Sequence, residues 1–249
     1  MINSNTFSNF NSKYPIYADL HTHSISSGHG SEDTITDMIR CASESGLSLF
    51  GISDHGPATS SSAKPSYFQS LKLADRDRFG IRVLYGAELN IINTAGDVDL
   101  DDEILSALDY AIISIHPPIF KPYHDKDLSS AYIRAMDHPK VRFLGHIDDA
   151  RFPVDFEYLL EIAKEKHVYP EINNGSLMPD AYRINGQENC RRILSICKKL
   201  DLPVLLSSDS HGKKNIGNMQ YIFPLLEELD FPAHLVLNSD LSVLSEIIR

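Results

Sequence analysis

The sequence is poor in cysteine, lacks tryptophan and has no long apolar run. Its 249 residues include three cysteines, Cys41, Cys190 and Cys197, which form no C-x-x-C pair. This argues against a disulfide framework or a thiolate zinc site and fits a reducing compartment. No stretch approaches the roughly 18 consecutive apolar residues of a membrane span, and the polar first residues offer no apolar core for secretion. We therefore expect a cytoplasmic protein with no membrane partner.

A block of consecutive basic residues is also missing. Lys and Arg number 23 against 34 Asp and Glu, which gives a formal charge of −11. Proteins that hold nucleic acid without sequence preference carry a basic stripe along the phosphates. The composition therefore disfavours nucleic acid as a partner.

Short apolar segments typical of strands alternate along the chain with segments of helical spacing. Strand starts lie about 25 to 36 residues apart, as expected of repeated βα units with buried parallel strands. The seven predicted strands cover residues 16–20, 49–53, 82–89, 110–115, 142–146, 168–173 and 203–209. Helices are predicted over 34–45, 102–108, 156–166 and 187–200. Seven units indicate a closed or nearly closed α/β barrel.

A doubly wound open sheet is the structural alternative, but no G-x-G-x-x-G or G-x-x-x-x-G-K-[ST] loop follows the first strand to support nucleotide binding. Residues 1–16 are rich in Asn and Ser and predict a flexible arm. Residues 17–249 are long enough for one substantial core and short for two, so we expect a single domain.

Seven of the eleven histidines lie at or just after the end of a predicted strand, where barrel enzymes place their active sites. His21 and His23 are two residues apart, so in extended geometry both rings point to the same side. Asp209 and His211 share this spacing. The other residues of this kind are His29, His55, Glu88, His116 and His146. One histidine at a strand end is usually a satisfied polar residue, but six such ends together favour a metal site.

The remaining histidines, which we assign to the surface, are His124, His138, His167 and His234. At the strand ends, imidazole and carboxylate without thiolate suit zinc, manganese or iron, and several contributing strands indicate more than one ion. Three divalent ions would bring six positive charges, whereas Glu88 and Asp209 supply two negative ones. Such a centre favours an anionic substrate and a bound hydroxide, because coordination lowers the pKa of water to about 7 in favourable zinc sites. Phosphate esters fit best, and an amidohydrolase with one or two ions is the alternative.

The motifs D-L-H-T-H, S-D-H-G, S-I-H-P-P, L-G-H and S-D-S-H, with His29 and Glu88, resemble the signature series of the PHP (polymerase and histidinol phosphatase) superfamily. Within it, G-I-S-D-H-G-P, I-F-K-P-Y-H-D-K, P-E-I-N-N-G-S and F-P-A-H-L-V-L-N most resemble the YcdX-type, zinc-dependent phosphatases. The resemblance covers nearly the whole chain from Tyr17 onward. It implies a distorted seven-stranded (βα) TIM-like barrel with a trinuclear centre.

Carried over residue by residue, the resemblance implies three divalent ions, with zinc favoured and manganese or iron as alternatives. The first ion would be held by His21, His23, Glu88 and Asp209. The second would be held by His29, His55 and His211. The third would be held by Glu88, His116 and His146, so that Glu88 bridges two ions.

Two loops depart from the family's pattern, and they leave the substrate open. The chain has Pro117 and Pro118 where members commonly read H-E-P, and I-D-D-A-R-F-P follows His146 in place of a P-G-N-P turn. Candidate substrate contacts beyond the strand ends are Lys126, Arg151, Arg183 and Asn173. Asp19 and Asp54 precede ligands and would face the other way, which suits a supporting role or none.

The hypothesis is a phosphoesterase that hydrolyses small phosphate monoesters by attack of a metal-bound hydroxide, with no protein nucleophile. The alternatives within the superfamily are a histidinol-phosphate phosphatase and a phosphodiesterase or nuclease. A non-catalytic metal-binding protein is a further alternative, which the presence of all nine ligands disfavours. The sequence specifies no oligomeric state.

Overall fold

A computed structural model describes residues 12–117, 119–120 and 126–249 of the chain. Seven strands pair in parallel in one curved sheet. In their order across the sheet these strands are β1 (Ala18–Asp19), β3 (Leu49–Ile52), β5 (Ile81–Asn90), β6 (Tyr110–Ser114), β7 (Val141–Leu144), β8 (Tyr169–Asn173) and β9 (Leu205–Ser207). A short strand, β4 (Asp77–Arg78), adds an antiparallel partner to β5. The predicted seven-stranded barrel is confirmed.

A gap remains between β1 and β9, the first and last strands of this sheet. Two further short strands bridge it at the carboxyl ends of β1 and β9. β2 (Thr22–His23) continues the line of β1, β10 (Ser210–His211) continues β9, and the two pair in parallel with His211 opposite His23. Between β9 and β10, Asp209 has a φ of 53°, a left-handed conformation that non-glycine residues rarely adopt. β2 and β10 thus lie just beyond the ends of the first and seventh predicted strands, 16–20 and 203–209, and were not predicted.

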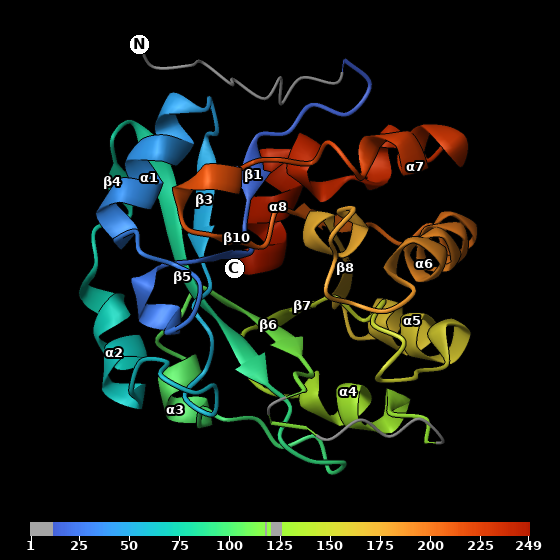
Figure 1. Ribbon diagram of the computed structural model, residues 1–249, viewed down its shortest axis with the longest axis horizontal. Helices are drawn as coiled ribbons and strands as arrows, with labels where there is room; N and C mark the ends of the chain where they lie inside the picture. Colours follow the sequence, from blue (N-terminus) through green and yellow to red (C-terminus); the bar gives the residue numbers. More distant parts are fainter. Residues whose placement is uncertain (1–11, 118, 121–125) are drawn as a thin grey trace.

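Helices surround the strands, as Figure 1 shows. They are α1 (Ile35–Glu44), α2 (Pro65–Ser70), α3 (Asp102–Leu105), α4 (Ser129–Ala135), α5 (Phe156–Glu165), α6 (Gly186–Leu200), α7 (Phe223–Glu228) and α8 (Leu241–Ile248). Helix α1 begins with a capping box, in which the Thr34 hydroxyl accepts from Asp37 N and the Asp37 carboxylate accepts from Thr34 N. The predicted helix over 102–108 was too long, since α3 ends at Leu105. None of the helices among the described residues is long and apolar enough to cross a membrane.

The core has two parts, and their placement decides where polar residues can gather. The larger part lies between the sheet and the helices. The smaller part fills the barrel interior, where Leu244 and Ile248 of α8 pack against Leu20, Tyr110 and Phe143. Helix α8, near the middle of Figure 1, thus closes the amino end of the barrel. The carboxyl end is left for the buried polar residues that follow the strands.

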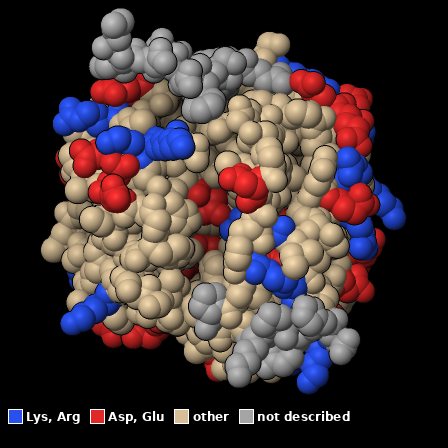
Figure 2. All heavy atoms as spheres, viewed as in Figure 1, with Lys and Arg blue, Asp and Glu red and all other residues tan. Residues whose placement is uncertain are grey.

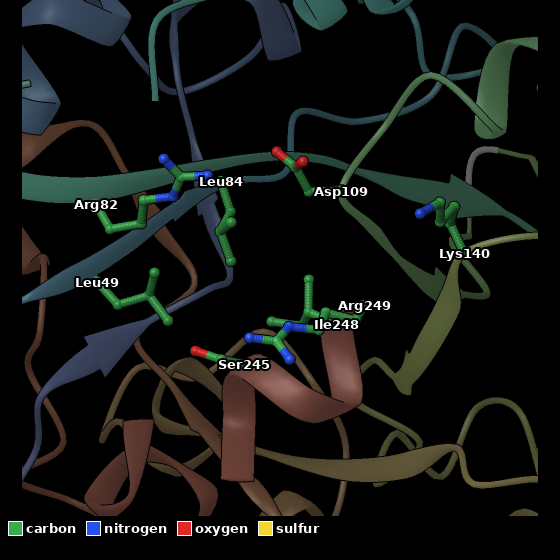
Figure 3. A pocket seen from close by; sticks show the side chains of 8 residues that line it. All are labelled: Leu49, Arg82, Leu84, Asp109, Lys140, Ser245, Ile248 and Arg249. Carbon is green, nitrogen blue, oxygen red and sulfur yellow. The ribbon is translucent and has the colours of Figure 1, made fainter. Parts of the chain in front are cut away.

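A cavity of about 380 Å³ lies beside α8 at this amino end, and Figure 3 shows its lining side chains. These are Leu49, Arg82, Leu84, Asp109, Lys140, Ser245, Ile248 and Arg249. None of the nine predicted metal ligands is among them. The cavity is therefore separate from the predicted site.

The folded domain begins earlier than the predicted boundary at Tyr17. Tyr14 and Ile16, which were placed in the flexible arm, are buried, and the Tyr14 hydroxyl donates to the carbonyl of Phe231 at 2.8 Å. Ile16 also belongs to the first predicted strand, 16–20, whereas the Asn- and Ser-rich composition of the first sixteen residues hid Tyr14, whose burial stabilises the fold. The rest of the predicted arm, residues 1–11, lies outside the described residues.

Candidate metal centre

Glu88, near the end of β5, lies at the middle of the predicted ligands. Its Oε1 is 2.8 Å from His146 Nε2 and 3.3 Å from His116 Nε2. Its Oε2 is 2.6 Å from His55 Nδ1 and 3.4 Å from His21 Nε2. The side chain is buried. A single carboxylate therefore faces imidazoles that follow four different strands.

Asp209 approaches the same centre from the bend between β9 and β10. Its Oδ1 is 3.1 Å from His23 Nε2 and 3.6 Å from His21 Nε2. The pairing of β2 with β10 places His211 beside His23, with ring centroids 4.3 Å apart. The left-handed backbone at Asp209 thus turns this carboxylate and His211 toward the first strand.

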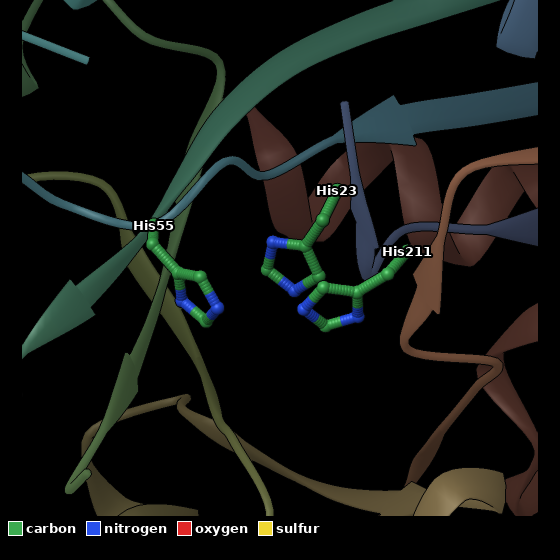
Figure 4. Close-up of side chains that lie close together, drawn as sticks. All are labelled: His23, His55 and His211. Atoms are coloured by element: carbon green, nitrogen blue, oxygen red, sulfur yellow. The ribbon is translucent and has the colours of Figure 1, made fainter. Parts of the chain in front are cut away.

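The remaining imidazoles stack close by. Ring centroids lie 4.2 Å apart for His23 and His55 and 4.7 Å apart for His29 and His55. His29 is also 5.0 Å from His211. Figure 4 shows the rings of His23, His55 and His211 turned toward one another. The structure therefore brings all nine predicted ligand residues to one place.

The buried polar atoms at this centre suit metal ions. Buried nitrogen and oxygen atoms are normally hydrogen-bonded. Although several of them lie close to a carboxylate oxygen, the following atoms make no hydrogen bond of suitable geometry: His21 Nε2, His23 Nε2, both ring nitrogens of His55, His211 Nε2 and Glu88 Oε2. Because these lone pairs and ring nitrogens converge, divalent cations can satisfy several of them at once. The donor set of imidazole and carboxylate suits zinc, manganese or iron.

Three overlapping groups of residues place their ligand atoms within 4.8 Å of one another. They are His21 with His23 and Glu88, His23 with His55 and His211, and His55 with Glu88 and His116. His21, His23 and Glu88 all belong to the ligands predicted for the first ion. Each of the other two groups combines two ligands predicted for one ion with one ligand predicted for another. The sharing of His23, His55 and Glu88 means that adjacent ions would lie close together.

The charges of the two carboxylates are retained despite their burial. Burial alone would raise the pKa of Glu88, but the neighbouring His116 and His21 hold it well below its ordinary value. Burial would likewise raise the pKa of Asp209, and His21 and Arg183 hold it well below. Both carboxylates are thus ionised, the form in which they bind metal.

The pKa values of three of the imidazoles are shifted, two downward and one upward. Burial, together with His55 and His211, holds the pKa of His23 well below its ordinary value and lowers that of His29. These two rings are therefore neutral, as metal ligation requires. Burial would also lower the pKa of His21, but Glu171 and Glu88 outweigh it and raise the pKa well above its ordinary value. The negative charges of Glu171 and Glu88, which favour a proton on His21, also favour a divalent cation beside this ring.

Glu171, on β8, supports the centre and was missed in the sequence. Its Oε1 lies 2.5 Å from His21 Nδ1, and its Oε2 accepts from the backbone N–H of His146 at 2.7 Å. Since Nδ1 of His21 is engaged by this carboxylate, Nε2 is left facing Glu88. A carboxylate in this position fixes the ring and raises its basicity as a metal ligand.

Two further ligand rings are held in the same way. Nδ1 of His116 lies 2.8 Å from the side-chain oxygen of Asn90. Nδ1 of His23 lies 3.0 Å from the Ser27 hydroxyl, which itself donates to Asp54 Oδ1 at 2.7 Å. Asp54 therefore has the supporting role that the sequence allowed.

Asp19 supports the bend before His211 and does not face the ligands. Its Oδ2 accepts from the Ser208 hydroxyl at 2.6 Å and from Gly217 N at 2.8 Å. Burial raises the pKa of Asp19 to about 6 against the opposing effect of these donors. The carboxylate ties β1 to the segment that carries Asp209.

Of the four candidate substrate contacts, two lie beside Asp209 and the other two have partners or surroundings elsewhere. Arg183 donates to Asp209 Oδ2 at 2.7 Å, and the amide of Asn173 donates to the same oxygen at 3.1 Å. The Asn173 oxygen accepts from Gly175 N, so both ends of this amide serve the protein. Arg151 pairs with Asp149. Lys126 lines a separate cavity with Asp127, Pro153, Val154, Asp155, Glu157 and Arg192.

The histidines assigned to the surface do not join the centre, as far as the structure describes them. His138 lies 2.7 Å from Asp102, and His234 is 71% exposed. His167 is also exposed. His124 lies outside the described residues.

A cavity of about 340 Å³ opens directly over the centre. Its floor is formed by His29, His55 and His116. The other described residues that line it are Thr59, Pro117, Ile119 and Tyr182. The volume is that of a small-molecule site.

Curated proteins of similar sequence align over almost the whole chain. A Clostridium acetobutylicum protein named "Probable phosphatase" is 36% identical over 231 residues, which cover 93% of each chain. A protein of the same name from Acetivibrio thermocellus is 34% identical and covers 93% of this chain and 94% of its own.

Solved structures show the same fold at lower sequence identity. A histidinol phosphate phosphatase from Lactococcus lactis, solved with zinc, L-histidinol and phosphate, superposes with a TM-score of 0.60. It is 20% identical and covers 86% of this chain and 94% of its own. The sequence profile of the PHP domain matches residues 19–175. The profile, the curated relatives and the barrel agree, and the chain belongs to the PHP family.

Proposed function

We propose that the protein is a phosphoric monoester hydrolase that works with three divalent ions, zinc being the favoured metal. The observation that carries this proposal is the convergence of buried, unpartnered ligand atoms on Glu88. The phosphatase names of relatives at 34 to 36% identity support the reaction class. The zinc and phosphate in the Lactococcus lactis enzyme support the cofactor and the anion.

In this proposal the nine ligands are divided as the family resemblance implies. The first ion takes His21, His23, Glu88 and Asp209. The second takes His29, His55 and His211. The third takes Glu88, His116 and His146. When bound, the ions supply Lewis acidity and lower the pKa of coordinated water toward neutrality.

The protein's own residues keep this centre charged and oriented. Glu88 and Asp209 contribute two negative charges, so three divalent ions leave a net positive site for a phosphate dianion. Glu171 and Asn90 fix the rings of His21 and His116. Arg183, whose Nη2 donates to Asp209 and whose Nη1 donates to the Ser176 hydroxyl, adds a guanidinium with further N–H groups for a phosphoryl oxygen.

Small monoesters suit the molecule better than nucleic acid. On the face shown in Figure 2, acidic and basic side chains are interspersed, and the described basic residues there form no continuous stripe. The formal charge of −11 repels polyanions at a distance. The nuclease and phosphodiesterase alternative is therefore disfavoured, while the cytoplasmic location stays a prediction.

The proposal is tested by elemental analysis of purified protein combined with assays on p-nitrophenyl phosphate, its bis-ester and single-stranded DNA. We expect close to three transition-metal ions per chain and fastest hydrolysis of the monoester. Chelation should abolish the activity. Faster cleavage of DNA than of the monoester would move the protein to the nuclease branch.

Glu88→Gln tests the bridge directly. Because the amide keeps the size of the side chain but loses its charge and one ligand oxygen, we expect fewer bound ions and loss of hydrolysis. Elemental analysis of the variant beside wild type measures the change. An unchanged ion count in the variant, or a single ion in wild type, would contradict the trinuclear centre.

A further inference from the structure

The wall of the cavity over the metal centre is apolar, although its floor is made of imidazoles. Pro117, Ile119 and Tyr182 form most of this wall. Thr59 is the other described residue there, and its hydroxyl both donates to Asn90 Oδ1 at 3.3 Å and accepts from Asn90 Nδ2 at 3.1 Å. The polar group of Thr59 is thus already occupied by the protein.

No carboxylate is among the described residues that line this cavity. Asp149 is connected to the wall through Arg151, which contacts Tyr182. Both carboxylate oxygens of Asp149 accept from Arg151 Nε at 2.9 Å. A cationic group on the substrate would therefore find no counterion in the described part of the wall and would face the ions proposed for the floor. Burying such an unpaired charge is strongly unfavourable.

Tyr182 is held in place although its side chain is exposed. The guanidinium carbon of Arg151 lies 4.1 Å from the centroid of the Tyr182 ring, which is a cation–π contact. Arg151 is fixed in turn by its pair with Asp149. Tyr182 is 69% exposed and lines the cavity, so an aromatic surface backed by Arg151 is presented at its mouth.

We propose that Tyr182, Ile119 and Pro117 form an apolar clamp for the leaving group, and that Arg151 positions Tyr182 in it. The preferred substrates are then phosphate monoesters of uncharged alcohols with an apolar or aromatic face. This inference rests on the proposed phosphatase function and names its substrate class. It assigns Arg151 to positioning the clamp, whereas the sequence offered this residue as one of four candidate substrate contacts.

The experiment compares benzyl phosphate, glycerol 3-phosphate and L-histidinol phosphate with the metal-loaded enzyme. All three are esters of primary alcohols, so their intrinsic reactivity is similar and differences in kcat/KM report recognition of the leaving group. We expect benzyl phosphate to be preferred over each of the others by at least about tenfold, the size of effect that apolar pocket contacts provide. Equal rates, or preference for histidinol phosphate, would overturn the clamp.

Substitutions of Tyr182 and Arg151 show whether these residues cause the preference for benzyl phosphate. Tyr182→Ala should raise KM for benzyl phosphate about tenfold while kcat, and both constants for glycerol 3-phosphate, change less than about twofold. Tyr182→Phe should retain wild-type values, and Arg151→Leu should raise KM for benzyl phosphate alone. Tyr158→Ala removes a tyrosine that is 49% exposed on α5, outside the cavity, and is the matched control. An equal loss for both substrates in Tyr182→Ala would contradict the clamp.

The two proposals fail in different ways. If metal-loaded wild type hydrolyses no monoester, the phosphatase function is wrong and the clamp falls with it. If it hydrolyses all three esters without discrimination, the phosphatase function holds and only the clamp is wrong.

Discussion

At the scale of single residues, the rings of His21, His23 and His116 each depend on a second side chain that fixes their orientation. Glu171 is the clearest case, because one carboxylate contacts the ring of His21 and the backbone N–H of His146. It also accepts from the Ser207 hydroxyl and from the amide of Asn173. The metal affinity of the centre should therefore depend on a residue that touches no metal.

We predict that Glu171→Gln lowers metal affinity about 10- to 100-fold, as the loss of such a partner does at other metal sites. The neutral amide keeps the shape of the side chain but removes the charge that orients His21 and raises its basicity. Competition with a chelator measures the affinity. The control is Glu161→Gln, the same chemical change at an exposed position of α5. Equal affinities for the two variants would contradict this role.

The sequence predicted the metal-facing residues but not all of their partners. The motifs D-L-H-T-H and S-D-S-H combine histidine with strand-end spacing, and both features can be recognised without coordinates. Glu171 and Asn90 carry no such motif, since an acidic or amide residue in a strand has many other roles. Glu171 lies in the motif P-E-I-N-N-G-S, which supports the family resemblance but specifies no role for this carboxylate. A further signal is the i, i+2 relation of Glu171 to Asn173 and of Glu88 to Asn90, which puts each pair on one face of its strand.

At the scale of elements, the sequence predicted seven strands in order but not the two short strands, β2 and β10, that follow the first and the last. Apolar runs reveal a strand, whereas the shift from β9 to β10 depends on the left-handed φ of Asp209 and on pairing with β2. That pairing joins residues far apart in the chain, so no local pattern encodes it. The early start of the domain at Tyr14 was missed for a similar reason, because its partner is Phe231.

Asn238 fills the gap between β1 and β9 below the β2–β10 pair. Its side-chain oxygen accepts from Leu206 N at 2.7 Å, and its amide donates to the carbonyls of Leu206 and Ala18, both at 2.8 Å. The backbone carbonyl of Asn238 accepts from Tyr17 N at 3.0 Å. The buried side chain therefore takes the place of the ladder that β1 and β9 do not form with each other.

We predict that Asn238→Ala lowers the free energy of unfolding by about 3 kcal/mol or more, since each buried polar group left unsatisfied costs about 1–3 kcal/mol. Chemical denaturation of the two proteins measures the difference. Asn93→Ala is the control, because Asn93 bonds Ala95 N in an exposed turn where water can replace it. A loss below about 1 kcal/mol for Asn238→Ala would show that the barrel closes without this side chain.

At the scale of the whole molecule, the two ends of the barrel have opposite character. The amino end is filled by apolar side chains and α8, and the carboxyl end by imidazoles and carboxylates that converge from most of the strands. Without cations, Glu88 Oε2 and several ring nitrogens have no partner, and burial makes that costly. Metal binding should therefore couple activity to the stability of the entire fold.

We predict that added zinc or manganese raises the thermal unfolding temperature of the metal-free protein, because ions that bind only the folded state stabilise it by mass action. At a thousandfold excess over Kd, one ion contributes about 4 kcal/mol, on the order of 10 °C for a chain of this size. His21→Ala should lose most of this rise together with activity. His234→Ala, which removes a histidine 71% exposed near Asp201, should keep both. Differential scanning calorimetry with and without metal gives the comparison within one amino-acid type, so it separates ligation from the general loss of a histidine. If the two variants respond to metal alike, the centre does not hold the strand ends together.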